Sequence, residues 1–161
     1  MSFDQIIESK LKSCYTTDLI RVKRNSIDEF ELIERLYPIG QNRIEWGDVK
    51  YTISKKVDLS DEINAKVQIL SFLQEVKEVL NVSDEILILV FGDEAIENVY
   101  EMPFYILESN VIDFFGLPQH TYVIPLNGSW CINYTFEDEL FFGISNRYST
   151  QNPDCSIKNI I

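Results

Sequence analysis

The stretch His120–Gly143, HTYVIPLNGSWCINYTFEDELFFG, predicts three consecutive antiparallel strands. Its first two apolar runs flank Asn127-Gly128, a pair typical of a two-residue type I′ hairpin turn because both residues tolerate a positive φ. A second reversal at Glu137-Asp138-Glu139 returns LFFGIS to the side of the middle strand. The sequence therefore predicts a β-meander at the C-terminal end of the fold.

Pro125 constrains how this meander joins the rest of the sheet. With a two-residue turn it lies opposite Trp130, and its missing N–H would have pointed away from the middle strand. We therefore expect the strand His120–Leu126 to be unpaired on its outer side around Pro125. In the middle strand, alternation places one set of side chains toward the core, namely Trp130, Ile132, Tyr134 and Phe136.

Upstream, apolar periodicity predicts three helices, over about residues 3–15, 26–37 and 60–80. Capping boxes are expected where Ser2 precedes Gln5 and where Ser26 precedes Glu29, and Pro38 should end the second helix. The third helix carries an apolar stripe expected to face the core, which consists of Ile63, Val67, Leu70, Leu73, Val76 and Leu80.

The remaining segments predict short elements. Gly47-Asp48 suggests a hairpin turn between two alternating stretches, and the unbroken apolar run EILILVF at 85–91 suggests a central strand. A short helix is expected over 93–100, a strand at 104–107, and helical turns over 110–115 closed by Gly116.

Together these patterns predict one α+β domain over residues 1–161. Its mainly antiparallel sheet would carry the C-terminal meander and pack against the N-terminal and central helices. Residues 145–161 are expected to form a loosely attached tail, because they are polar until the last positions.

The net charge of −12 is concentrated in the second half of the chain. Residues 1–80 hold 12 Lys and Arg against 14 Asp and Glu, a net of −2, whereas residues 81–161 hold 2 against 12, a net of −10. Between Lys77 and Arg147 there is no base, while 12 acids fall in that interval. Direct nucleic-acid binding is therefore not expected, because it depends on Lys and Arg contacts to phosphate.

The compartment follows from two absences in the sequence pattern. No apolar run approaches the ~20 residues of a membrane span, and the N-terminus lacks the apolar core of a secretory signal. Three widely separated cysteines, Cys14, Cys131 and Cys155, fit a reducing compartment better than a disulfide framework, and we expect each to be a small buried residue. A cytoplasmic protein without membrane contact is predicted.

No motif predicts catalysis or a cofactor. The only histidine, His120, lies at a strand start, where a structural hydrogen bond is the expected role. Carboxylates are plentiful enough for calcium or magnesium, but the spacing of a calcium loop is missing, so no metal and no cofactor is expected. A small acidic enzyme or a ligand-binding regulatory protein using clustered carboxylates remains the alternative reading.

The uncompensated acids suggest a basic partner protein. A soluble surface ordinarily interleaves both signs, because long runs of one sign repel each other, and an oppositely charged partner relieves that repulsion. Tyrosine is also enriched in interface hot spots. The expected partner-binding residues are Glu137, Asp138, Glu139, Asp93, Glu94, Glu97, Tyr122 and Tyr134.

The segment Pro118–Gly143 resembles the end of small bacterial immunity proteins that guard against contact-dependent growth inhibition and related polymorphic toxins. Similar endings pair a PQHTY-like strand with a W-x-x-x-Y strand, an acidic turn and an FFG strand. The resemblance implies a protein that binds and neutralises a cognate basic toxin domain, expected to be a nuclease, without doing chemistry itself. The turn departs from tighter relatives because Glu137-Asp138-Glu139 contains no glycine.

Overall fold

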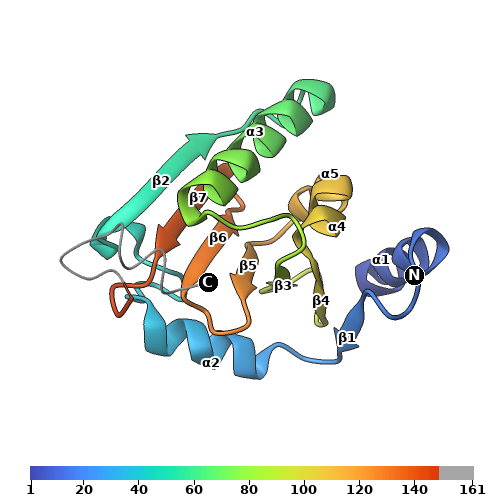
Figure 1. Ribbon diagram of the computed structural model, residues 1–161, viewed down its shortest axis with the longest axis horizontal. Helices are drawn as coiled ribbons and strands as arrows, with labels where there is room; N and C mark the ends of the chain where they lie inside the picture. The colour runs from blue at the N-terminus through green and yellow to red at the C-terminus, as the bar shows by residue number, and fades with distance from the viewer. Residues whose placement is uncertain (149–161) are drawn as a thin grey trace.

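A computed structural model describes residues 1–148 and contains one seven-stranded antiparallel sheet in the order β1-β4-β3-β5-β6-β7-β2 (Figure 1). This confirms the predicted α+β class with a mainly antiparallel sheet and a C-terminal meander. The strands are β1 Arg21–Lys23, β2 Tyr51–Lys56, β3 Leu87–Gly92, β4 Val99–Pro103, β5 Thr121–Pro125, β6 Trp130–Tyr134 and β7 Glu139–Ile144.

Helices cover both faces of the sheet. Figure 1 shows α3 over one face, with α4 and α5 beside it, and α2 beneath the other. The helices are α1 Phe3–Cys14, α2 Ile27–Leu36, α3 Glu62–Leu80, α4 Phe104–Ser109 and α5 Val111–Phe115, with a short 3₁₀ helix, η1, at Trp46–Asp48. Because both faces are covered, the middle strand β6 is buried on both sides.

The helix starts agree with the sequence in part. Ser2 and Gln5 form the expected capping box, each side chain accepting the other's backbone N–H. Helix α2 begins at Ile27 as expected, but Ser26 makes no side-chain cap, so the second capping box is wrong. The physical reason is that the Glu29 carboxylate turns to Lys23 of β1, at 3.3 Å.

Helix α3 exists as predicted but buries a different face. Ile63 is 82% exposed and Val67 61% exposed, so the first half of the expected stripe is wrong. The buried face comprises Ala65, Ile69, Phe72, Leu73, Val76 and Leu80. Apolar residues occur on two adjoining faces of this helix, so periodicity alone did not determine which one meets the sheet.

The meander has the predicted strand register, with Val123 opposite Ile132. Its first turn is not type I′, because only Gly128 has a positive φ, of 71°, and the Gly128 N–H bonds the Pro125 carbonyl at 3.0 Å. The prediction that β5 is unpaired on its outer side around Pro125 is also wrong. Strand β3 pairs along that side, with Ile88 opposite Pro125, and Pro125 is tolerated because it is the last residue of its strand.

Three short elements differ from the expectation. Gly47-Asp48 belongs to η1 rather than to a hairpin, residues 93–98 form a loop that leads into β4, and residues 104–107 begin α4. The Phe104 and Tyr105 N–H groups bond carbonyls that precede β3, at 2.9 Å each, which favours a helical turn there. Gly116 ends α5 as predicted.

The predictions for Phe136, for the start of the tail and for Cys14 are also wrong. Phe136 is 64% exposed because β6 ends two residues earlier. The expected tail does not start at residue 145, because Ser145 is buried and its hydroxyl donates to the Leu36 carbonyl at 2.6 Å; residues 149–161 lie outside the described part. Cys131 is buried as expected, whereas Cys14 is exposed, and Cys155 lies outside the described residues. Within residues 1–148 no helix has both the length and the apolar character to cross a membrane.

Candidate protein-binding site

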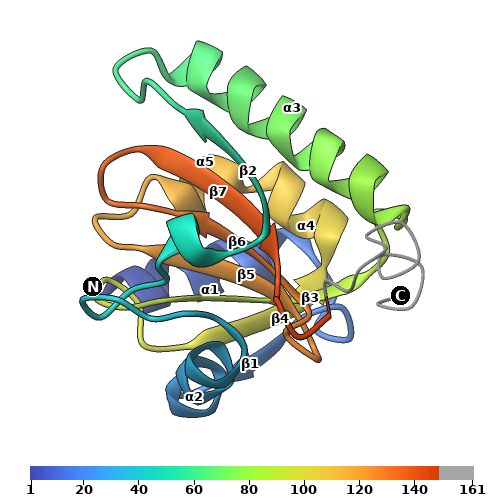
Figure 2. The same ribbon diagram turned by 90° about the vertical axis from the view of Figure 1, so that its left-hand side faces the viewer.

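Two acidic loops meet at one end of the sheet. The pairing brings the end of β3 beside the start of β5, and the start of β5 beside the end of β6 and its turn into β7. Figure 2 shows the β3–β4 loop and the β6–β7 turn on the same side of the sheet, the side that carries the N-terminus. We call the six carboxylates of these loops the acidic end; they are Asp93, Glu94, Glu97, Glu137, Asp138 and Glu139.

His120 connects the two loops. Its backbone N–H donates to Asp93 Oδ1 at 2.9 Å, and its ring Nδ1 accepts the Phe136 N–H at 3.3 Å. Because Nδ1 acts as an acceptor, the neutral ring carries its proton on Nε2. The only histidine therefore has a structural role that ties the acidic end together.

Gln119 holds the β3–β4 loop from inside. This side chain is 2% exposed, and its Oε1 accepts the N–H groups of Glu94, Ala95 and Ile96 at 3.4, 2.8 and 3.1 Å. Gly92 makes room for it, since a Cβ there would lie 2.1 Å from Gln119 Nε2. The sequence analysis missed Gln119, although a glycine that ends an apolar strand is a signal for close approach.

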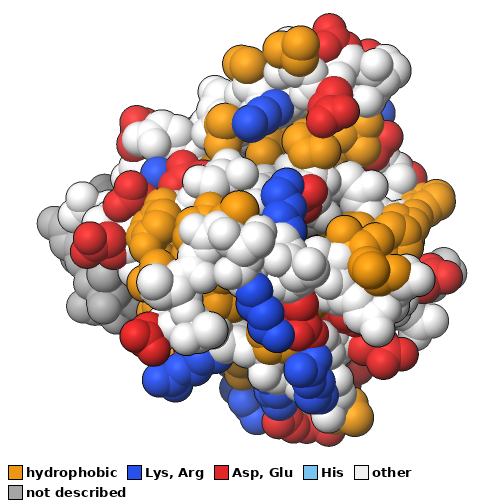
Figure 3. Space-filling view, turned by 90° about the vertical axis from the view of Figure 1, so that its right-hand side faces the viewer, with side chains coloured by type: hydrophobic (Ala, Val, Ile, Leu, Met, Phe, Trp, Pro, Cys, Tyr) orange, Lys and Arg blue, Asp and Glu red, His pale blue; other side chains and the backbone are white. Residues whose placement is uncertain are grey.

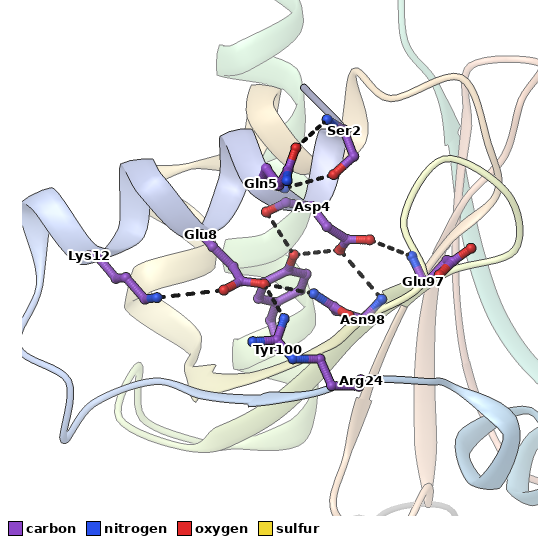
Figure 4. A network of polar contacts seen from close by, with 9 residues as sticks. All are labelled: Ser2, Asp4, Gln5, Glu8, Lys12, Arg24, Glu97, Asn98 and Tyr100. Carbon is purple, nitrogen blue, oxygen red and sulfur yellow. Dashed lines mark hydrogen bonds and ion pairs between the residues drawn. The ribbon is translucent and has the colours of Figure 1, made fainter.

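Helix α1 anchors the other side of the same loop (Figure 4). The Asp4 carboxylate accepts the N–H groups of Glu97 and Asn98 at 2.8 and 3.4 Å, and the Tyr100 hydroxyl donates to it at 2.5 Å. Burial, and then the hydrogen bond to Asp4, raise the pKa of Tyr100. Glu8 accepts the side-chain amide of Asn98 at 2.8 Å. The acidic β3–β4 loop is thus fixed at both ends.

In the β6–β7 turn an aspartate occupies the position where a tight turn commonly has a glycine. Asp138 has a φ of 59°, in the left-handed region that Asp tolerates better than most residues. Its N–H bonds the Thr135 carbonyl at 3.0 Å, and its carboxylate accepts the Tyr134 hydroxyl at 3.2 Å. Burial, and then the charge of Asp138, raise the pKa of Tyr134.

The carboxylates of the acidic end differ in their availability. Asp93 and Asp138 accept internal hydrogen bonds, and Glu137 forms an ion pair with Arg43 at 3.2 Å. Slight burial raises the pKa of Glu137, but the Arg43 hydrogen bond and charge lower it more, so the net shift is downward. Of the six carboxylates of the acidic end, three form no hydrogen bond or ion pair with residues 1–148, and these are Glu94, Glu97 and Glu139.

The fold neutralises part of the negative half of the chain. Within the described residues, four of the twelve acids between Lys77 and Arg147 pair with bases from residues 1–80. The pairs are Lys10–Asp113, Arg21–Glu101, Arg43–Glu137 and Lys77–Glu108. Figure 3 shows the result on the face that carries α1 and β1, where side chains of both signs are interspersed. The expectation of a wholly uncompensated half is wrong, because α1, β1, α3 and the segment after α2 bring bases beside it.

The two tyrosines predicted to contact a partner are buried. Tyr122 packs against Phe30 and Phe91, with ring centroids 5.4 and 5.6 Å away, and Tyr134 stacks on Phe115 at 5.2 Å. Their burial contradicts a contact role. The sheet is covered on both faces, so strand alternation brings neither side chain to the surface.

A groove lies beside the β6–β7 turn, with a volume of about 310 Å³. The segment Arg43–Gly47 forms one wall, and side chains of β6, β7 and the turn form the rest. The Trp46 and Phe141 rings stack there, 5.4 Å apart and within 3° of parallel. Arg43 and Trp46 had not been expected at the site, because their distance along the chain from the turn leaves no local signal.

The described residues contain no group of three or more His, Cys, Asp or Glu side chains arranged to hold a metal ion. Comparison of the sequence with models of known protein families finds no match, and comparison with curated proteins finds none either.

Proposed function

We propose that the chain is an immunity protein that binds and neutralises a basic toxin domain, a nuclease, through the acidic end. The observation that carries the proposal is the meeting of two acidic loops at one end of the sheet. Three carboxylates there have no partner among residues 1–148. The resemblance of Pro118–Gly143 to immunity proteins supports the toxin as the class of partner.

The anchoring of the loops supports a binding role. Gln119, Asp4 and His120 hold the backbone that carries the carboxylates, so little conformational entropy is lost when a partner docks. Exposed charges on such a scaffold steer an oppositely charged protein and raise the association rate, toward about 10⁸–10⁹ M⁻¹s⁻¹ at low salt. A nuclease has a basic cleft because it binds phosphates, and that cleft complements the acidic end.

The alternative, a small acidic enzyme or ligand-binding regulatory protein that uses clustered carboxylates, is favoured less. A catalytic acid commonly has its pKa raised by burial, whereas the pKa of Glu137 is lowered and its side chain is exposed. The groove beside the turn is the feature that supports a ligand.

The test is a matched pair of charge reversals that change the net charge equally. The first variant carries Glu94→Lys, Glu97→Lys and Glu137→Lys at the acidic end. The control carries Glu75→Lys, Asp84→Lys and Glu85→Lys, three exposed acids on α3 and before β3. The probe is the basic C-terminal domain of a secreted protein encoded by the adjacent upstream gene, and binding is measured at two salt concentrations.

We expect the acidic-end variant to lose at least about a hundredfold in affinity. Three interfacial charge pairs at the lower end of about 1.5 kcal/mol each sum to more than that loss requires. The control should change affinity only a few fold, through long-range steering. Equal losses in both variants would show that total charge, rather than this end of the sheet, determines binding. An upstream gene for a metabolic enzyme would overturn the toxin as partner.

A further inference from the structure

We infer that the groove beside the β6–β7 turn binds the guanidinium group of an arginine side chain presented by a partner protein. The inference rests on the proposed function for the identity of that partner, but the chemistry of the groove can be tested without it. The charged and aromatic residues that line the groove are Arg43, Glu45, Trp46, Glu137, Glu139 and Phe141.

The groove exists because short side chains form its floor. Asn133 of β6 and Thr135, the residue after β6, line the groove, and both form internal hydrogen bonds. Asn133 Oδ1 accepts the Trp46 indole N–H at 3.1 Å, and Thr135 Oγ1 accepts the Glu139 N–H at 3.2 Å. Helix α2 ends at Leu36 and does not extend over this part of the sheet. The space above the two residues is therefore left for an external group.

The lining selects a planar cation. Three glutamates against one arginine give the groove a net charge of −2, which disfavours anions. Phe141 stacks on Trp46 with one face and is only half-buried. A guanidinium stacks on an aromatic ring and donates two N–H bonds in its plane to carboxylate oxygens, whereas an ammonium has no planar face to stack and donates to carboxylates as a compact point charge. The volume of about 310 Å³ is at the lower end for ligand sites, which suits one side chain.

Arg43 already makes a weaker version of this contact. Its guanidinium lies 3.2 Å from Glu137 Oε1, and the two side chains are 52% and 61% exposed, so the pair contributes little. A partner's arginine inside the groove would meet Glu45 and Glu139 as well. Arg43 thus competes with the partner's arginine for the carboxylates of the groove, and its removal should strengthen binding of that arginine.

The experiment titrates the full chain with Nα-acetyl-arginine amide and, separately, with the citrulline analogue, which has the same shape without the charge. A ¹H–¹⁵N correlation NMR spectrum follows the Trp46 indole N–H, which lies at the groove because it bonds Asn133 there. We expect saturable shifts with the arginine compound and none with citrulline. Glu139→Gln should weaken binding about two- to fivefold, the effect of one exposed ion pair, and Arg43→Gln should strengthen it. Glu75→Gln, an exposed acid on α3, is the matched control and should change nothing.

Equal shifts with citrulline would overturn the inference, as would equal weakening by Glu139→Gln and Glu75→Gln. Weaker binding in Arg43→Gln would overturn the role of Arg43 as a competitor, and unchanged binding would overturn the groove as the site. The two proposals fail separately. If arginine binds but the acidic-end reversal leaves toxin affinity intact, the proposed function is wrong; if the reversal abolishes toxin binding but arginine does not bind, only the present inference is wrong.

Discussion

Gln119 and Gly92 provide the most direct test of how the acidic end is built. In Gln119→Ala the loop loses the acceptor of three backbone N–H groups, of which the Ile96 group is buried. An unsatisfied buried donor costs about 1–3 kcal/mol, and the bond to the partly exposed Ala95 group contributes about 0.5–1.5 kcal/mol. The 3.4 Å bond to Glu94 adds little. We expect a loss of about 2–4 kcal/mol in the free energy of unfolding, which lowers Tm by roughly 6–12 °C for a chain of this size.

Gly92→Ala should reproduce most of this loss by another route. Its Cβ would lie 2.1 Å from Gln119 Nε2, so the glutamine must leave its position and abandon the same N–H groups. The double variant Gly92→Ala/Gln119→Ala should therefore be about as stable as Gln119→Ala alone. The expected coupling energy is about 2 kcal/mol, well above the ~0.5 kcal/mol scatter of independent sites.

Urea unfolding followed by tryptophan fluorescence measures all four proteins. The chain has two tryptophans, and neither Trp46 nor Trp130 lies in the β3–β4 loop, so the signal reports global unfolding. Additive losses in the double variant would refute the steric link between the two residues. A loss below about 1 kcal/mol in Gln119→Ala would refute the role of its side chain as the internal anchor.

Three further predictions concern the fold that supports the site. Gly143→Ala places a Cβ 2.6 Å from the Trp46 ring and should cost about 1–3 kcal/mol in urea unfolding, through overpacking that also disturbs the groove; an unchanged midpoint would contradict it. Burial, and then the bond to Asp4, raise the pKa of Tyr100 above its ordinary 10.0, so the unfolded chain loses this proton first as pH rises. Stability should hold below about pH 9 and fall above about pH 10, less steeply in Tyr100→Phe, and identical Tm profiles for parent and variant would refute this. Lys77→Met leaves Glu108 unpaired in a mostly buried ion pair of 3.0 Å and should cost about 1–3 kcal/mol, part of which Lys77→Met/Glu108→Gln recovers; no recovery in thermal unfolding would exclude the unpaired charge as the cause.

Local patterns predicted the parts of the fold that depend on neighbours in the chain. The register of β5, β6 and β7 follows from two short turns, and the capping box at Ser2 involves residues three apart. Periodicity predicted that α3 exists but not its buried face, because Ile63 and Val67 extend the apolar pattern to a side that meets water. The neighbour of β5 on its outer side is β3, about thirty residues upstream, and no local signal identifies it.

The same limit applies to the candidate site. Counting charges along the chain located the carboxylates, but the Arg43–Glu137 pair joins residues 94 positions apart. The tyrosines were assigned to the surface from their residue type, and the second layer over the sheet buries them. Gln119 was not predicted because an uncharged amide carries no compositional signal, although its side chain fixes the backbone of the loop that carries Glu94.

The order of the strands has a consequence for how the acidic end assembles during synthesis. Among residues 1–148, strand β2 pairs with β7 alone, and β7 is the last of these seven strands to leave the ribosome. Until then β2 has no neighbour, Trp46 has no Phe141 to stack on, and neither the second acidic loop nor the groove exists. A nascent chain that stalls before Glu139 would display the first acidic loop at most, so the complete acidic end forms only after β7 has been synthesised.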